Sequence, residues 1–296
     1  MMIGEMKRMS STHNRFRATL LGLCLVAIAS FAGPTNASAQ EVQVTGPLAG
    51  APAVHHMRIY RENRVMLIPH IGITLRDSFQ RNLMIGGQLH YHFLDWLGIG
   101  LWGSYGGVGF STELTREIEE LGTTSSTNRL SLPGRANFSQ QLGQITWAAG
   151  PQINFIPLRG KLALFQKLFI DTDFYIQAGV VFLGIQERAN VRAADCETAG
   201  DVDACYLGSQ TNRSNRVAVR PSFGVGLNAY INSFLGIQIE WRGFPAAINE
   251  SGWDQAGPDA KFPDGAINEH DRLSRLYHLV SLGFIVFLPP NQKISK

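Results

Sequence analysis

A pair of histidines is the first feature of this 296-residue sequence that could do chemistry. His90 and His92 are two positions apart, so on a β-strand both imidazoles would point the same way. Two imidazoles can ligate a metal ion, but a metal site normally needs a third or fourth ligand. We therefore interpret both histidines as hydrogen-bonding residues and expect neither a metal nor any other cofactor.

Serine and histidine could also form a hydrolytic site, in which a histidine activates a serine nucleophile. His278 and Ser281 fall on opposite faces of a strand by parity, and the sequence has no Gly-x-Ser-x-Gly elbow. We therefore expect no catalytic residue and predict that the protein is not an enzyme. The alternative is an outer-membrane lipid-modifying enzyme that uses one of these serines: Ser104, Ser222 or Ser281.

Alternation of apolar with polar or small residues predicts the elements that would position these side chains. Alternation with period two is typical of β-strands. In residues 83–93, for example, Leu83, Ile85 and Leu89 fall on one face and the two histidines on the other. Five segments alternate clearly and three do so less regularly: 83–93, 144–155, 170–182, 216–231 and 235–244, then 65–75, 97–107 and 277–288.

Strands of this kind predict an all-β fold, a transmembrane antiparallel up-and-down barrel of about eight strands. A soluble β-sandwich is the structural alternative. Connections alternate between tight turns at 94–96 and 232–234 and long polar loops at 108–143, 184–215 and 245–275, as in membrane barrels. We expect a long turn at 157–168, a short surface helix within 112–121 and solvated acids in the last loop.

Polar residues of the strand faces give the candidate site. The interior of an eight-stranded barrel is just wide enough to be filled by side chains. Because both signs of charge occur and buried charges need partners, we expect a salt-bridged network in the lumen. A water-filled pore is the alternative. The predicted network comprises Gln88, His90, His92, Gln152, Asp171, Asp173, Arg220, Glu240 and Arg242.

The first 39 residues have the three parts of a secretory signal peptide. A basic region is followed by an apolar run at 18–32, and then by Ala37-Ser38-Ala39. The run is short for a membrane-spanning helix, which needs about 20 residues. Without this segment the basic excess of the chain disappears, so charge gives no reason to expect nucleic acid as a partner.

Export also bears on the cysteines. Cys24 would leave with the signal peptide, and Cys196 and Cys205 would remain, nine positions apart. In an oxidising compartment two such cysteines most simply form a local disulfide, with a metal or redox site as the alternative.

Two short motifs carry a resemblance to a known family. Residues 278–287 resemble the C-terminal assembly signal of bacterial outer-membrane proteins, and aromatic-Leu-Gly-Ile recurs at 96–99 and 234–237. Over roughly residues 60–288 the chain looks like the small outer-membrane β-barrel domain proteins of the OmpA-like type, similar to those of myxobacteria and their relatives. The resemblance implies a location and an architecture, because such families include structural, adhesive and enzymatic members.

We therefore predict a signal peptide at 1–39, a periplasmic leader at 40–64, a barrel at 65–288 and a periplasmic tail at 289–296. The location would be the outer membrane of a Gram-negative cell, with both termini in the periplasm. Expected partners are outer-membrane lipid, the barrel-assembly machinery and other envelope proteins. The predicted function is a non-enzymatic structural or interaction role, including that of a subunit in an envelope assembly. A narrow passive, porin-like channel for small solutes is the first alternative.

Overall fold

The computed structural model describes residues 61–75, 77–122, 129–131, 137–164, 168–259 and 262–289. The predicted signal peptide, nearly all of the leader and the tail after Pro289 lie outside these residues, and they remain predictions. No helix in the described ranges is long and apolar enough to cross a membrane.

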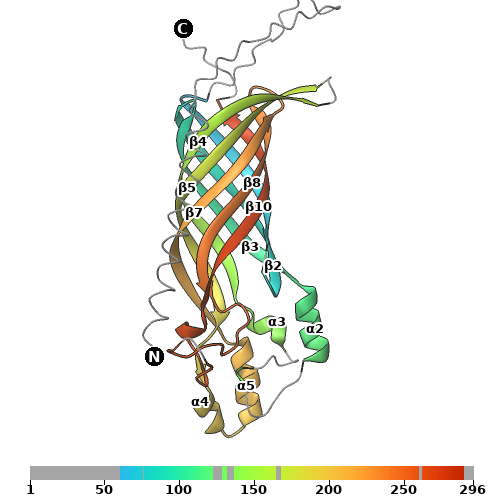
Figure 1. Cartoon of the computed structure of the whole chain (residues 1–296), viewed down its shortest axis with the longest axis vertical. Helices are drawn as coiled ribbons and strands as arrows, with labels where there is room; N and C mark the ends of the chain where they lie inside the picture. The colour runs from blue at the N-terminus through green and yellow to red at the C-terminus, as the bar shows by residue number, and fades with distance from the viewer. Residues whose placement is uncertain are drawn as a thin grey trace, which may run out of the picture. The chain divides into compact units, whose positions relative to one another are not determined.

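Eight antiparallel strands form a closed barrel, so the predicted fold class is confirmed (Figure 1). Each strand contains or closely overlaps one of the eight predicted segments. Ladder partners can be followed from strand to strand once around the barrel. The path that starts at Val65 of the first strand returns to that strand at Leu75, a stagger of ten residues. Eight strands with this stagger enclose an interior that side chains can fill. The strands are β1 (Arg64–Leu75), β2 (Gln80–Leu94), β3 (Leu97–Ser111), β4 (Gln144–Leu164), β5 (Leu168–Arg188), β7 (Arg213–Tyr230), β8 (Leu235–Ile248) and β10 (Leu273–Leu288).

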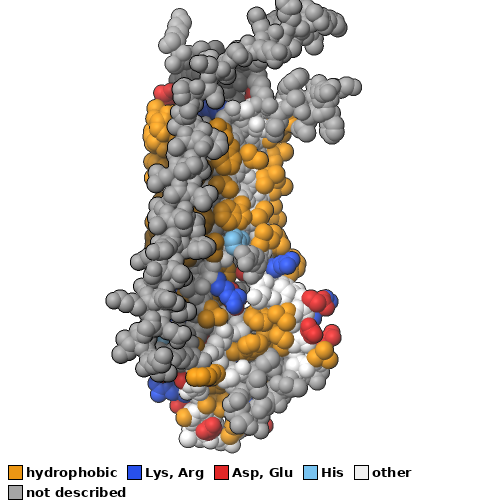
Figure 2. All heavy atoms as spheres, viewed as in Figure 1, with side chains coloured by type: hydrophobic (Ala, Val, Ile, Leu, Met, Phe, Trp, Pro, Cys, Tyr) orange, Lys and Arg blue, Asp and Glu red, His pale blue; other side chains and the backbone are white. Residues whose placement is uncertain are grey.

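The outer wall of the barrel is apolar. Leu101 and Leu282 are 59% and 53% exposed, whereas Gln88 and Glu240 on the inner faces are buried. On the face drawn in Figure 2, hydrophobic side chains cover the described wall and charged side chains gather at its two ends. The alternation in the sequence thus sorts apolar residues outward and most polar residues inward.

The expected long turn at 157–168 is wrong. β4 and β5 continue through this region as a hairpin, and their pairing runs from Leu158 with Phe174 to Leu164 with Leu168. The ladder shifts register between Phe155 and Leu158, next to Pro157. Proline cannot donate a ladder hydrogen bond, and a bulge accommodates it while the residues beyond keep their backbone donors.

The long loops fold into a cap at one end of the barrel, opposite the tight turns (Figure 1). The predicted surface helix is present as α2 (Glu113–Leu121), with the side chain of Thr112 capping its N-terminus. Two loops are joined by a two-stranded sheet of β6 (Val191–Arg192) and β9 (Ala266–Ile267). The other elements of the cap are α3 (Phe138–Gln141), α4 (Ala193–Glu197), α5 (Val202–Thr211) and a 3₁₀ turn at Glu269–Asp271.

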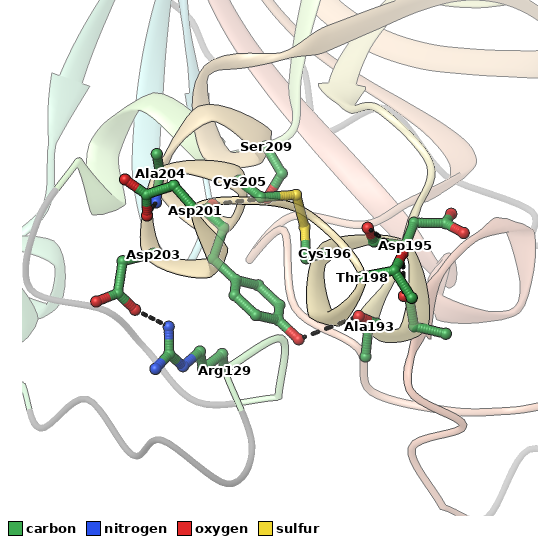
Figure 3. The surroundings of a disulfide bond; sticks show 12 residues. Arg129, Ala193, Asp195, Cys196, Thr198, Asp201, Asp203, Ala204, Cys205 and Ser209 are labelled. Atoms are coloured by element: carbon green, nitrogen blue, oxygen red, sulfur yellow. Dashed lines mark hydrogen bonds and ion pairs between the residues drawn. A yellow bond between two sulfur atoms is a disulfide. The ribbon is translucent and has the colours of Figure 1, made fainter.

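The expected disulfide is present. Cys196 of α4 is bonded to Cys205 of α5, and their Cα atoms are 5.4 Å apart. Figure 3 shows this bond between the two short helices, with Arg129 from an earlier loop paired with Asp203 of α5. The disulfide and the ion pair together hold the two helices in the cap.

The cap has its own interior. The rings of Phe79, Phe138 and Trp253 pack with centroids 5.6–5.7 Å apart. Asp254 and Asp271, two of the loop acids that we expected to be solvated, are buried. Their carboxylates accept backbone N–H groups of their own loop, so the acids build the loop.

Candidate functional site

A polar layer lies across the middle of the barrel lumen, and we call it the middle layer. Its centre is an ion pair between Glu240 and Arg242, two residues apart on β8 and both buried, with an N···O distance of 3.0 Å. The guanidinium also donates to Gln152 Oε1 at 2.8 Å. Gln88 Nε2 donates to Glu240 Oε2 at 2.8 Å, and the Nε2 of His90 lies 3.0 Å from Gln88 Oε1.

Two aromatic residues also belong to the middle layer, as does the buried Gln238, which accepts from Gln88 Nε2 at 3.1 Å. The Tyr175 hydroxyl donates to Glu240 Oε2 at 2.8 Å, and the guanidinium of Arg242 lies over the Trp102 ring, 4.2 Å from its centroid. The sequence-based site lacked all three. Tyr175 falls on the polar face of its segment, and that was the available signal; contacts across the lumen are not visible in a sequence.

Apolar side chains fill the lumen on both sides of the middle layer. The cap-side cluster includes Phe244, Leu183 and Leu279, each 0% exposed. The cluster on the side of the tight turns consists of Met66, Ile68, Tyr230, Ile285 and Phe287, all buried. The inner faces are therefore not polar throughout, because inward positions near both ends carry apolar residues. Buried polar residues, among them Asn154 and Asn228, lie on the inner faces of the same half as the second cluster.

Arginines close the lumen at the end with the tight turns. Arg61 is buried, pairs with Asp173 and donates to the Tyr230 hydroxyl at 3.2 Å. Arg64 donates to the Pro289 carbonyl at 2.9 Å and lies over the Phe287 ring, 4.6 Å from its centroid. This end of the barrel is therefore filled by side chains from the residues that precede and begin β1.

The structure brings five of the nine predicted lumen residues into one hydrogen-bonded cluster: Gln88, His90, Gln152, Glu240 and Arg242. His92 is buried next to His90, with ring centroids 6.1 Å apart, and Asp173 instead pairs with Arg61. Asp171 is half-buried near the turns. Arg220 differs most from the expectation, because its side chain is exposed.

The serine and histidine candidates for hydrolysis do not meet. Ser104, Ser222 and Ser281 are buried and lie on the inward faces of their strands. His278 lies on the outward face of β10, with its ring 5.6 Å from that of Trp241. Within the described ranges, no group of three or more His, Cys, Asp or Glu side chains could hold a metal ion.

Carboxyl groups at the cap have shifted pKa values. Burial raises the pKa of Asp77, in the loop between β1 and β2, from 3.8 to about 6; the Thr74 hydroxyl opposes this shift and the nearby Glu250 adds to it. Burial likewise raises the pKa of Asp254, although two backbone N–H groups bonded to it act in the opposite direction. At neutral pH the base of the cap therefore holds charges that burial disfavours.

A second polar cluster, centred on Glu187, ties the cap to the barrel. The buried Glu187 carboxylate accepts from Arg216 and from Arg272, each at 2.8 Å. Arg216 also donates to the Ala247 carbonyl of β8. No pattern in the sequence places Glu187 in a site, because its two arginine partners lie far away along the chain, at the ends of two other strands.

No protein-family model and no curated protein sequence matches the chain. Among solved structures, the chain is similar to the N-terminal β-barrel domain of Pseudomonas aeruginosa OprF, at 9% identity over 77% of this chain and 98% of that one, with a TM-score of 0.40. The outer membrane protein OprG from the same organism shares 11% identity over 77% and 96% of the two chains (TM-score 0.36). Ail, the attachment invasion locus protein of Yersinia pestis, shares 9% over 77% and 99% (TM-score 0.33).

Proposed function

We propose that this protein is a non-enzymatic integral outer-membrane barrel, whose filled lumen serves as a rigid scaffold and whose cap contacts other envelope components. The filled lumen is the observation that carries the proposal. A buried ion pair with its hydrogen bonds occupies the middle, and an apolar cluster lies on each side. This packing leaves the wall and the cap as the surfaces for interaction.

Membrane insertion is supported by the wall, which exposes large apolar side chains on every strand. Monomeric soluble proteins rarely expose contiguous apolar patches of more than a few hundred Å². β1 begins and β10 ends at the end opposite the cap. With an N-terminal signal peptide, the simplest orientation has both termini in the periplasm and the cap outside the cell. Lipid, the assembly machinery and envelope proteins are the proposed partners.

Features of the cap support a role in binding other envelope components. Leu207 and Leu121 are 45% and 71% exposed on short helices, although the cap already buries other apolar residues. Single exposed apolar residues are normal on protein surfaces, so these two leucines only mark positions where we propose that the cap makes contact. The disulfide stiffens this part of the cap, which favours a preformed binding surface.

Conductance tests this proposal against the channel alternative. The mature protein would be folded in detergent, with folding confirmed by heat-dependent gel mobility, and added to a planar lipid bilayer beside an open porin as a positive control. We expect no steps above the bare bilayer, because the inward side chains are buried and an apolar cluster lies on each side of the middle layer. Steady and reproducible steps from the wild-type protein would contradict the filled scaffold and favour a narrow channel.

A further inference from the structure

The ladder between β7 and β8 is incomplete. The two strands pair from Tyr230 with Gly236 up to Phe223 with Gly243, and the pairing stops there. Beyond this point β7 continues to pair with β5 as far as Arg213, and β8 continues to pair with β10 as far as Ile248. Residues 213–222 of β7 and 244–248 of β8 therefore face each other without ladder bonds. We call this interval the seam.

Two prolines explain why the ladder stops. Continuing the register of β7 and β8 would place Pro221 directly opposite Pro245. Neither residue has a backbone N–H, so this rung cannot donate a hydrogen bond from either strand. At its cap end the seam is crossed by the Arg216 side chain, which donates to the Ala247 carbonyl. The seam is thus a bounded interval in the barrel wall. The ladder between β3 and β4 also stops early, at Tyr105 with Trp147, but no proline pair lies at that point.

Arg220 lies within the seam and is exposed, although its strand position faces inward. Ala218 and Ser222, two residues away on either side, are both buried. The inner neighbours at this level are apolar and packed: Val181, its ladder partner, and Ala246 are each 1% exposed. The exposed part of the Arg220 side chain therefore lies at the seam.

Arg220 also differs from Arg216, which binds Glu187 and Ala247. Within the described ranges, Arg220 has no hydrogen bond, ion pair or ring contact. Yet Val217 and Val219, toward the cap, are exposed wall residues, as is Phe223 on the other side. Arg220 is therefore a cation without a protein partner inside the apolar wall. Such residues mark ligand or ion sites in membrane proteins.

We propose that the seam binds a membrane lipid with a phosphate headgroup, and that Arg220 donates to the phosphate. Guanidinium groups form bidentate, charge-assisted hydrogen bonds with phosphate. An acyl chain would lie on the outer wall next to the seam, where the rings of Phe223 and Trp241 are 5.7 Å apart. This inference rests on the proposed membrane insertion, because the ligand reaches Arg220 from within the bilayer.

Native mass spectrometry of the folded protein in a neutral detergent would measure the binding of phosphatidylglycerol and of diacylglycerol with the same chains. Diacylglycerol has no phosphate and should bind the wild type and Arg220→Gln alike. We expect Arg220→Gln to weaken phosphatidylglycerol binding at least about tenfold, as removing a hydrogen bond to a charged group does. Arg116→Gln, at an exposed arginine of α2, is the matched control and should bind like the wild type. Equal binding by Arg220→Gln and the wild type would overturn the proposal.

A second variant tests the seam without touching the arginine. Pro221→Val with Pro245→Val supplies the missing donors, so the ladder should extend and phosphatidylglycerol binding should fall. Unchanged binding would show that the seam is not needed and would contradict the proposal. Competition by equimolar inorganic phosphate would likewise contradict it, because it would indicate a site for a free anion. Conductance steps from the wild type would refute the filled lumen but would not bear on lipid binding at the seam. The two proposals can therefore fail independently.

Discussion

At the residue scale, the buried pair of Glu240 and Arg242 shows how charges persist inside this barrel. Each charged group has several partners, because burying an unpaired charge is costly. The sequence contained part of this information: the two residues share one face of an alternating strand. The sequence did not show that Tyr175 and Trp102 lie at the same level of the barrel as this pair. Alternation predicts which face of a strand a residue occupies, and not its position along the barrel axis.

Removing one member of this pair should destabilise the barrel more than removing both. Glu240→Gln leaves the Arg242 charge buried without a counterion, and such changes cost about 3–5 kcal/mol. Adding Arg242→Met should recover most of this loss, because methionine fills similar volume without a charge. The measurement is the free energy of unfolding in urea, with the protein in lipid vesicles. If Glu240→Gln alone were as stable as the wild type, the ion pair would have to be accessible to water.

Asp77 should make stability depend on pH. Its pKa is about 6 in the folded protein and 3.8 when unperturbed, so the folded state holds this proton more tightly than the unfolded chain. The free energy of unfolding should therefore fall as the pH rises from about 4 to about 6, by roughly 1–2 kcal/mol given the partial exposure of the group. Below pH 4 the contribution is fully present.

Asp77→Asn tests this dependence, because the amide keeps the shape of the side chain and does not titrate. The unfolding free energy of this variant should decline less between pH 4 and 6 than that of the wild type, because the Asp77 contribution is gone while that of Asp254 remains. Asp259→Asn, at an exposed acid of the cap, should decline like the wild type. An unchanged slope in Asp77→Asn would assign the pH dependence to other groups.

At the element scale, local pattern succeeded for the strands and failed for the cap. Alternation over about ten residues is sufficient to predict a strand, and all eight segments became strands. α3 and α4 have only four and five residues, too few to show a helical period. β6 and β9 are two-residue strands that find each other across about 75 residues. Contacts between loops determine these elements, and no local pattern predicts them.

The disulfide should stabilise the cap locally and leave the barrel unchanged. Replacing Cys196 and Cys205 by serine removes a link that closes a short loop, a change worth about 2–3 kcal/mol. Hydrogen exchange should speed up in α4 and α5, while β5 and β7 keep their protection. Faster exchange throughout the barrel strands would contradict a local role. The wild type with a reductant should reproduce the exchange pattern of the double variant.

At the scale of the whole molecule, closure of the barrel fixes which residues can meet. Eight strands and a stagger of ten residues give a lumen that side chains fill in successive layers. The sequence predicted closure and the apolar wall, since both follow from strand number and alternation. It could not predict the apolar clusters at both ends or the exposure of Arg220. These depend on tilt, on register and on the interrupted pairing next to Pro221 and Pro245.

The apolar wall leads to a depth-dependent prediction that separates a membrane barrel from a soluble one. Leu101→Arg and Leu282→Arg place a cation on the exposed wall in mid-strand, which costs about 2–4 kcal/mol near the bilayer midplane. Ile231→Arg changes an equally exposed wall residue in the turn after β7, where the cost is about 0–1 kcal/mol. Insertion into lipid vesicles, measured as the protease-protected fraction, should therefore fall sharply for the first two variants only. Lipid is the one environment that distinguishes these positions by depth, because in water all three arginines would be solvated. Equal insertion of all three variants would therefore count against a membrane-spanning wall.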